Sequence, residues 1–221
     1  MNVLVIGASR GIGLEFVRQY RAEGASVTAS ARDEAGLDRL RALGATPIRV
    51  DVADAASASG LAWKIDGLKF DVAIVSVGVS GERVAAFEAP TEENFDAVMH
   101  TNVLGPMRVV AQIAVALAAG AKVAVLSSRM GSIGSRTSAT SWLYRASKAA
   151  VNSVLKDTAL TLEGRATCIA FHPGWVRTDM GGSGADIDVA VSVAGMRRVI
   201  AGLAQEDNGS FFNHDGQAIP W

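Results

Sequence analysis

Tyr144 and Lys148 stand four residues apart in a stretch with helical periodicity, so both side chains lie on one face of a helix. A phenol ordinarily loses its proton near pH ~10, and an isolated tyrosine is therefore a weak base at neutral pH. An ammonium group held close to the phenol stabilises the phenolate and lowers its pKa. The pair can then act as general acid and base on a carbonyl/alcohol couple.

A glycine-rich turn near the start of the chain has the features of a phosphate-binding site. The apolar run 3–6 precedes Gly7-Ala8-Ser9-Arg10-Gly11-Ile12-Gly13, and residues with helical periodicity follow it. This order places free backbone N–H groups and a positive helix end at the mouth of a strand. The glycines also let a pyrophosphate approach the backbone closely. The alternative is an ordinary turn in which the glycines serve geometry alone.

Composition limits the classes of protein to consider. The chain has 221 residues, of which 49% are apolar, and a net charge of −1. These values predict one α/β domain over 1–221 and argue against a nucleic-acid-binding surface. No apolar run approaches the length of about 20 residues that spans a membrane, and we expect no signal peptide. Cys168 is the single cysteine, which fits a reducing compartment and a cytoplasmic location.

Apolar strand-like runs alternate with helical patterns along the chain. The expected strands cover 3–6, 25–31, 46–50, 70–77, 121–126, 166–171 and 210–213. The expected helices cover 14–23, 33–43, 54–65, 91–119, 142–162 and 189–204, and Pro106 should bend or interrupt the fourth. The alternation predicts a single doubly wound Rossmann-fold domain, with a seven-stranded parallel sheet and helices on both faces.

Ligands in such sheets bind outside the carboxyl ends of the strands. The turn-forming and polar residues expected at those ends are Gly7, Arg32, Asp51, Gly78, Ser128 and Pro173. The loops 78–90 and 129–141 should border the same crevice, and the glycine-rich segment 177–188 is expected to be mobile and to close over it. The three histidines have no partners at metal-ligand spacing, so we expect no metal.

The end of the second strand bears on the choice of cofactor. An NAD enzyme carries a carboxylate there, which accepts hydrogen bonds from the ribose 2′-OH. Here Ala31 leaves room, and the guanidinium groups of Arg32 and Arg10 suit a 2′-phosphate. The rival is Asp33, which we interpret as the N-cap of the following helix. The sequence therefore favours NADP(H), with NAD(H) as the alternative.

Several motifs occur in order along essentially all 221 residues, and together they are more specific than any one of them. They are Gly7-x-x-x-Gly11-Ile12-Gly13, Asp51-Val52, Thr101-Asn102-Val103, Ser127-Ser128-x-x-Gly131-Ser132, Tyr144-x-x-x-Lys148 and His172-Pro173-Gly174-Trp175-Val176-x-Thr178. With them the chain resembles the short-chain dehydrogenase/reductase family of NAD(P)-dependent oxidoreductases. Within that family it is similar to small carbonyl-reductase-like members related to the sniffer and C-factor proteins.

The resemblance implies a role for each catalytic position. Tyr144 would donate a proton to a substrate carbonyl, and Lys148 would lower its pKa and bind the nicotinamide ribose. Ser128, rather than Ser127, would hold the substrate oxygen and stabilise developing charge. Asn102 would hold a water molecule that relays protons to Lys148.

The resemblance also implies a set of cofactor-binding residues, with Asp51 at the adenine amino group and Thr178 near the carboxamide. The set is Gly7, Ser9, Arg10, Gly11, Ile12, Gly13, Arg32, Asp51, Val52, Val77, Gly78, Tyr144, Lys148, Pro173, Gly174, Val176 and Thr178. One stretch departs from the family. Its usual Asn-Asn-Ala-Gly is replaced by Val75-Ser76-Val77-Gly78, and we expect some loss of local rigidity there.

Two functions are consistent with these residues. The first is an NADP(H)-dependent oxidoreductase acting on a small carbonyl or alcohol. The second is a non-catalytic NADP(H)-binding sensor or regulatory protein of the same fold. The complete set of four catalytic positions favours the enzyme. The resemblance also implies a homodimer or homotetramer that pairs through the helices around 91–119 and 142–162.

Overall fold

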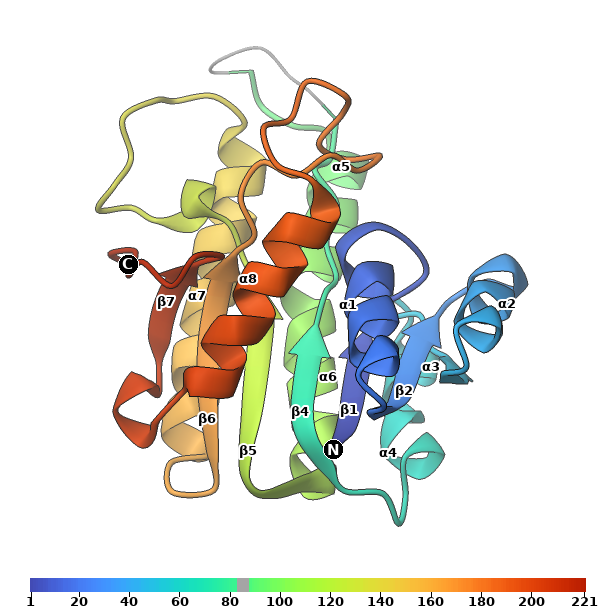
Figure 1. The fold of residues 1–221 in the computed structure, drawn as a ribbon. Helices are drawn as coiled ribbons and strands as arrows, with labels where there is room; N and C mark the ends of the chain where they lie inside the picture. The colour runs from blue at the N-terminus through green and yellow to red at the C-terminus, as the bar shows by residue number, and fades with distance from the viewer. Residues whose placement is uncertain (83–87) are drawn as a thin grey trace.

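Seven short apolar runs form one parallel sheet in the computed structural model, which describes residues 1–82 and 88–221 (Figure 1). The strands are β1 (Asn2–Ile6), β2 (Ser26–Ala31), β3 (Thr46–Arg49), β4 (Phe70–Val75), β5 (Leu117–Leu126), β6 (Ala166–His172) and β7 (Ser210–Asn213). Their order is β3-β2-β1-β4-β5-β6-β7, and every neighbouring pair is parallel. The chain therefore winds outward in both directions from the β1–β4 pair, which confirms the predicted fold. The expected loop 78–90 lies partly outside the described residues.

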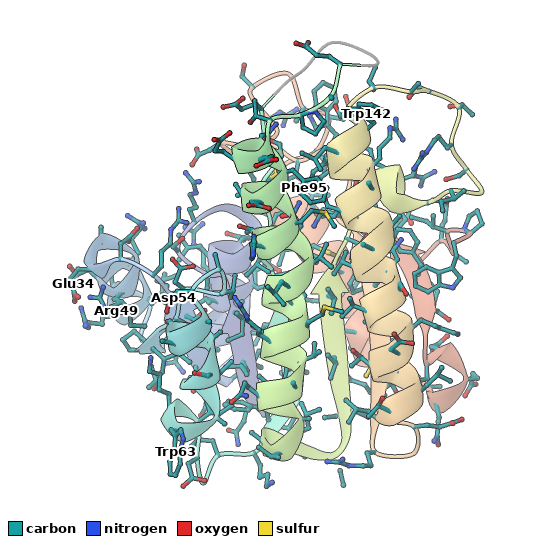
Figure 2. The ribbon with its side chains drawn as sticks, turned by 180° about the vertical axis from the view of Figure 1, so that it is seen from behind. Glu34, Arg49, Asp54, Trp63, Phe95 and Trp142 are labelled. Atoms are coloured by element: carbon teal, nitrogen blue, oxygen red, sulfur yellow. The ribbon has the colours of Figure 1, made fainter. Side chains whose placement is uncertain are left out.

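Helices cover both faces of the sheet. They are α1 (Gly11–Ala22), α2 (Glu34–Ala42), α3 (Ala55–Ser59), α4 (Leu61–Lys64), α5 (Glu92–Met99), α6 (Gly105–Ile113), α7 (Trp142–Thr161) and α8 (Val189–Gly202). In Figure 1, α1 and α8 lie in front of the sheet. Figure 2 shows the opposite face, where α5 and α6 run beside α7. No helix among the described residues is long and apolar enough to cross a membrane.

Strand β4 shows how the sheet joins these two layers. Successive side chains of a strand point to opposite faces. Val72 and Ile74 accordingly pack in the cluster with α1 and α8, while Ala73 and Val75 pack in the cluster with α6 and α7. All four side chains are buried. A strand buried on both faces explains the continuous apolar run that the sequence shows here.

The expected helix 91–119 is wrong in its last three residues and divided in its middle. A π-helical turn, His100–Leu104, separates α5 from α6. Pro106 lies in the first turn of α6, where its missing N–H costs no intrahelical bond, so the predicted interruption is confirmed. The strand β5 begins at Leu117 rather than at 121. Periodicity does not separate helix from strand in the run of small apolar residues there.

Other boundaries differ by less. The expected helix 54–65 is two short helices, because Gly60 ends α3 and precedes α4. Strand β4 ends at Val75, two residues earlier than predicted. The carboxylate of Asp33 accepts a hydrogen bond from the N–H of Gly36 at 2.7 Å. The prediction that Asp33 is the N-cap of α2 is therefore confirmed.

The first testable consequence concerns the sheet centre. The substitution Ile74→Ala should lower the free energy of unfolding by about 2–5 kcal/mol, because Ile74 is fully buried and its truncation leaves a cavity. Ile133→Ala is the matched control, since Ile133 is 69% exposed and should change stability by less than about 0.5 kcal/mol. Urea unfolding of both variants measures the difference. Equal losses would contradict the assignment of Ile74 to the core.

Candidate active site

The glycine turn lies directly against the end of β4. Gly7 has a φ of +85°, and a Cβ at this position would stand 2.5 Å from the carbonyl oxygen of Ser76. A Cβ on Gly13 would stand 2.2 Å from the carbonyl oxygen of Gly7. The turn therefore packs against both β4 and the first turn of α1 through backbone alone, and a side chain at either position would force it apart.

Ser30 fixes the same turn from β2, although the sequence analysis did not single it out. Its Oγ accepts a hydrogen bond from the N–H of Gly7 at 2.9 Å, and its carbonyl accepts one from Ala8 at 2.8 Å. Ser30 is 1% exposed. The only available signal was a hydroxyl near the end of this strand, and Ser26 and Thr28 of the same strand carry hydroxyls too. A buried polar group is nearly always hydrogen-bonded, which explains why Ser30 has these partners.

The start of α1 provides donors for an anion. This helix begins at Gly11, three residues earlier than predicted, and the first N–H groups of a helix have no partner within it. Gly11, Ile12 and Gly13 all line a crevice of about 260 Å³ at the carboxyl edge of the sheet. Unpaired N–H groups and the positive end of the helix dipole together favour a phosphate there.

The crevice brings together nearly all of the predicted cofactor-binding residues. Those that line it are Gly7, Ser9, Arg10, Gly11, Ile12, Gly13, Arg32, Asp51, Val52, Val77, Gly78, Tyr144, Lys148, Pro173 and Thr178. Further lining residues that the sequence analysis did not predict as binding include Ser76, Val79, Thr101, Leu126, Ser127, Asp179 and Met180. These residues lie within two positions of predicted ones along the chain. That closeness was the only feature of the sequence that could have indicated them.

Gly174 and Val176 are not among the lining residues, and both contact the segment 177–188, since a Cβ on Gly174 would stand 2.4 Å from Cδ1 of Ile187. Their part in cofactor binding stays a prediction. Val176 is 4% exposed and pairs in parallel with Ile187. The N–H of Arg177 donates to the carbonyl of Ile187 at 2.9 Å, and the N–H of Ile187 donates to Trp175 at 3.1 Å. The segment is thus held at both of its ends. Its mobility stays a prediction.

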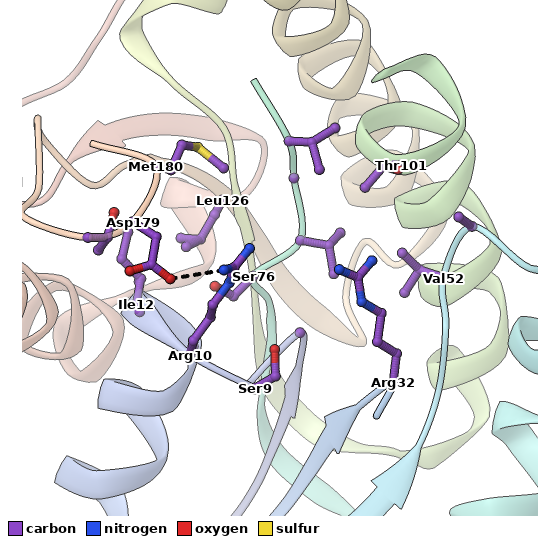
Figure 3. Close-up of a pocket in the computed structure, with 18 of the residues that line it drawn as sticks. Ser9, Arg10, Ile12, Arg32, Val52, Ser76, Thr101, Leu126, Asp179 and Met180 are labelled. Carbon is purple, nitrogen blue, oxygen red and sulfur yellow. Dashed lines mark hydrogen bonds and ion pairs between the residues drawn. The ribbon is translucent and has the colours of Figure 1, made fainter. Parts of the chain in front are cut away.

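Two arginines approach the crevice from different elements (Figure 3). Arg32 extends from the end of β2 towards Val52. Arg10, in the glycine turn, forms an ion pair with Asp179 at 2.9 Å, which links that turn to the segment 177–188. Both side chains of the pair are more than two-thirds exposed, so the contact is worth no more than about 1 kcal/mol. An anionic ligand could readily replace Asp179 as the partner of Arg10.

Lys148 is buried beside Tyr144. Its Nζ lies 5.8 Å from the centroid of the Tyr144 ring and donates a hydrogen bond to the carbonyl of Leu126 at 3.0 Å. A Cβ on Gly78 would stand 3.1 Å from this Nζ. Gly78, the residue retained from the family motif, therefore leaves the space that the ammonium group occupies.

Burial shifts the pKa of both the Lys148 ammonium and the Tyr144 phenol. It lowers the pKa of Lys148 to about 8. It raises the pKa of Tyr144, and a hydrogen bond with Ser128 offsets part of this rise. The pKa of Tyr144 is therefore raised on balance, and the expected lowering by Lys148 stays a prediction. Removing the phenolate from water outweighs the effect of its neighbours.

Asn102 is fully buried in the π-helical turn between α5 and α6. Its Oδ1 accepts a hydrogen bond from the N–H of Val79 at 2.7 Å, and its Nδ2 donates to the carbonyl of Val79 at 2.8 Å. The same Nδ2 donates to Ser147 Oγ at 2.9 Å. Asn102 thus ties the chain after β4 to α7, next to the stretch that departs from the family motif. Its role with a relay water stays a prediction.

The catalytic positions meet at the end of this crevice. Tyr144 and Lys148 line it, Ser128 bonds Tyr144, and Asn102 approaches Gly78. Among the described residues, no three His, Cys, Asp or Glu side chains gather closely enough to hold a metal ion. The arrangement can offer a phenol proton, a hydroxyl donor and a buried ammonium to a polar carbon–oxygen bond beside a phosphate site.

Comparisons with known proteins agree with this geometry. The model of the short chain dehydrogenase family matches residues 1–198. C-signal of Myxococcus xanthus is 41% identical over 155 residues, which cover 68% of this chain and 92% of that protein. The carbonyl reductase Sniffer of D. melanogaster has a TM-score of 0.90 at 26% identity, over 100% of this chain and 99% of the other. A carbonyl reductase from Pseudomonas aeruginosa PAO1 in complex with NADP has a TM-score of 0.85 at 32% identity, with the same coverage.

The buried ammonium has a measurable effect on stability. Between pH 8 and 10.5, the unfolded chain keeps a proton on Lys148 that the folded chain releases, so alkaline pH favours folding at this site. Relative to Lys148→Met, the free energy of unfolding of the unmodified protein should rise by about 3 kcal/mol across that window. Below pH 8 the difference should be constant. Urea unfolding at pH 7 to 10.5 measures it, and a difference independent of pH would contradict the lowered pKa.

Proposed function

Because the chain belongs to the short-chain dehydrogenase family, we propose that it is an NADP(H)-dependent oxidoreductase that interconverts a carbonyl and an alcohol. The observation that carries the proposal is the meeting of Tyr144 and Lys148 in the crevice that the glycine turn lines, with Ser128, which is not itself a lining residue, hydrogen-bonded to Tyr144. The family membership that the sequence motifs predicted is confirmed. The activity and the site residues are the proposal.

The residues present suit NADP(H). Gly7 and Gly13 leave a cradle that a Cβ would fill, and the N-terminus of α1 offers donors for the pyrophosphate. Arg32 and Arg10 supply cations for a 2′-phosphate, and Ala31 adds no negative charge beside them. The similar Pseudomonas carbonyl reductase was solved in complex with NADP, which supports the same preference. Asp51 lines the crevice near the end of β3, where it can accept a hydrogen bond from an adenine amino group.

The chain's own residues would supply binding, orientation and protons. The nicotinamide, when bound, supplies the hydride. Tyr144 donates its phenol proton to the substrate oxygen during reduction and regains it from solvent. Ser128 donates a hydrogen bond to that oxygen as charge develops on it. Lys148 holds positive charge behind the phenol, so that the phenolate left by proton transfer is stabilised.

A second function has its own support. C-signal, the similar protein of Myxococcus xanthus, bears the name of a signal rather than of an enzyme. A protein of this fold could bind NADP(H) and pass that state to a partner without turnover. The retention of Asn102, Ser128, Tyr144 and Lys148 in one place favours the enzyme, since a sensor does not need all four.

The remaining sequence expectations stay proposals. They are a small-molecule substrate, a cytoplasmic location and a homodimer or homotetramer. The oligomer has some support in the exposed apolar residues of the neighbouring helices α5, α6 and α7. These are Phe95, Met107, Trp142 and Leu160. Their exposure gives the helical face of Figure 2 apolar area that a second copy could cover.

The mechanism predicts how kcat changes when the phenol oxygen of Tyr144 is removed. Tyr144→Phe keeps the ring and its packing but loses the proton donor, so kcat should fall by a factor of about 10² or more. The affinity for NADPH should change little. NADPH oxidation measured against a panel of aldehydes, ketones and quinones tests both points. Activity retained in Tyr144→Phe would reject the assigned mechanism, while NADPH binding without turnover of any compound would favour the sensor.

The cofactor preference predicts a selective loss. Arg32→Ala should weaken NADPH binding by roughly tenfold or more, because one charge-assisted contact is worth about 1.5–3 kcal/mol. NADH binding should be almost unaffected, since NADH has no 2′-phosphate. Fluorescence titration with each cofactor gives the two dissociation constants. A preference of the unmodified protein for NADH, or equal weakening of both cofactors, would overturn the assignment.

A further inference from the structure

Asn152 continues the face of α7 that carries Tyr144 and Lys148, because the spacing of four residues repeats. It is 5% exposed. Its Oδ1 accepts a hydrogen bond from Ser127 Oγ at 2.5 Å, and its Nδ2 donates to the carbonyl of Gly131 at 3.4 Å. One buried amide therefore bonds the residue just before Ser128 and the residue three positions after it.

The chain between these two contacts is a single tight turn. The N–H of Gly131 donates to the carbonyl of Ser128 at 2.8 Å, and the N–H of Met130 donates to Ser128 Oγ at 3.2 Å. A Cβ on Gly131 would stand 2.6 Å from the carbonyl carbon of Lys148. The turn thus rests on the backbone of α7 without a side chain between them. Its place along the helix depends on directional bonds rather than on interlocking side chains.

The geometry points to Asn152 as a positioning residue, which holds the turn 127–131 against α7 so that the Ser128 hydroxyl stays in reach of Tyr144. Asn152 would act only through Ser127 and Gly131, since it is not among the residues that line the crevice. This inference rests on the proposed function, in which Ser128 and Tyr144 act on one substrate oxygen. The inference adds a structural reason why Ser128 and Tyr144 lie in position to act together.

The first arm of the test does not depend on turnover. Asn152→Leu keeps a similar volume but removes both hydrogen bonds. Amide hydrogen exchange of Met130 and Gly131 should become at least tenfold faster, while the amides in the middle of α7 stay protected. The matched control is Thr158→Val on the same helix, because Thr158 is also buried and, among the residues that the structure describes, its hydroxyl donates only to the carbonyl of Val154. This control should leave Met130 and Gly131 unchanged.

The second arm follows Tyr144 itself. The hydrogen bond with Ser128 lowers the pKa of the phenol, so its loss should move to higher pH the limb of the kcat profile that reports Tyr144, which lies above the limb near pH 8 where Lys148 loses its proton. In Asn152→Leu, kcat should fall about tenfold or more, with the dissociation constant of NADPH within twofold of its original value. Ser127→Ala breaks the same bond from the other end. Ser127→Ala should give the same changes in amide exchange and kcat, and combining it with Asn152→Leu should change them little further. It also serves as the test if Asn152→Leu does not fold.

The outcomes separate the inference from the function on which it rests. Unchanged exchange at Met130 and Gly131 overturns the inference, as does faster exchange with an unchanged kcat profile. An equal fall of kcat in Thr158→Val would reduce Asn152 to a general stabilising residue. If the unmodified protein reduces no carbonyl, the proposed function fails instead. The Cζ chemical shift of Tyr144, one of two tyrosines in the chain, then decides, and a shift unaltered by Asn152→Leu overturns the inference.

Discussion

The burial of one ammonium group constrains much of the candidate site. Removing the Lys148 charge from water is costly, and within the described part of the chain its one direct hydrogen bond goes to the carbonyl of Leu126. Gly78 leaves space for the Nζ, and Gly131 lets the turn after β5 reach the backbone of the same residue. In the proposed mechanism this cost falls where a positive charge is useful, behind a phenol that gives up a proton.

The two halves of the site are built by different means. The cofactor half depends on backbone: close approaches at Gly7 and Gly13 and unpaired N–H groups at the start of α1. The catalytic half depends on buried side-chain amides. Asn102 joins the chain after β4 to α7, and Asn152 joins the turn after β5 to the same helix. Helix α7 therefore holds both the chain that follows β4 and the turn that follows β5, which is the neighbouring strand.

The sequence was most informative where a residue type has one physical use. The glycine spacing, the Tyr144–Lys148 pair and Asp33 as a cap predicted both the fold and most of the crevice. It was least informative where contacts between distant segments determine the secondary structure or the burial of a side chain. The small apolar residues before Lys122 suit helix and strand equally, and only pairing with β4 at Leu117 and with β6 at Ala121 makes them strand. The rise in the pKa of Tyr144 that burial causes was not predicted, because spacing along a helix does not report the extent of burial.

The contact between Arg10 and Asp179 has a kinetic consequence. A surface ion pair worth about 0.2–1 kcal/mol separates and reforms readily at ordinary temperature, and added salt weakens it further. By itself it could slow the entry of a dinucleotide by no more than about fivefold. The same carboxylate, once displaced by a phosphate, would repel that phosphate and hasten its departure. Under the proposed function, Asp179 would thus favour rapid exchange of a spent cofactor over tight retention.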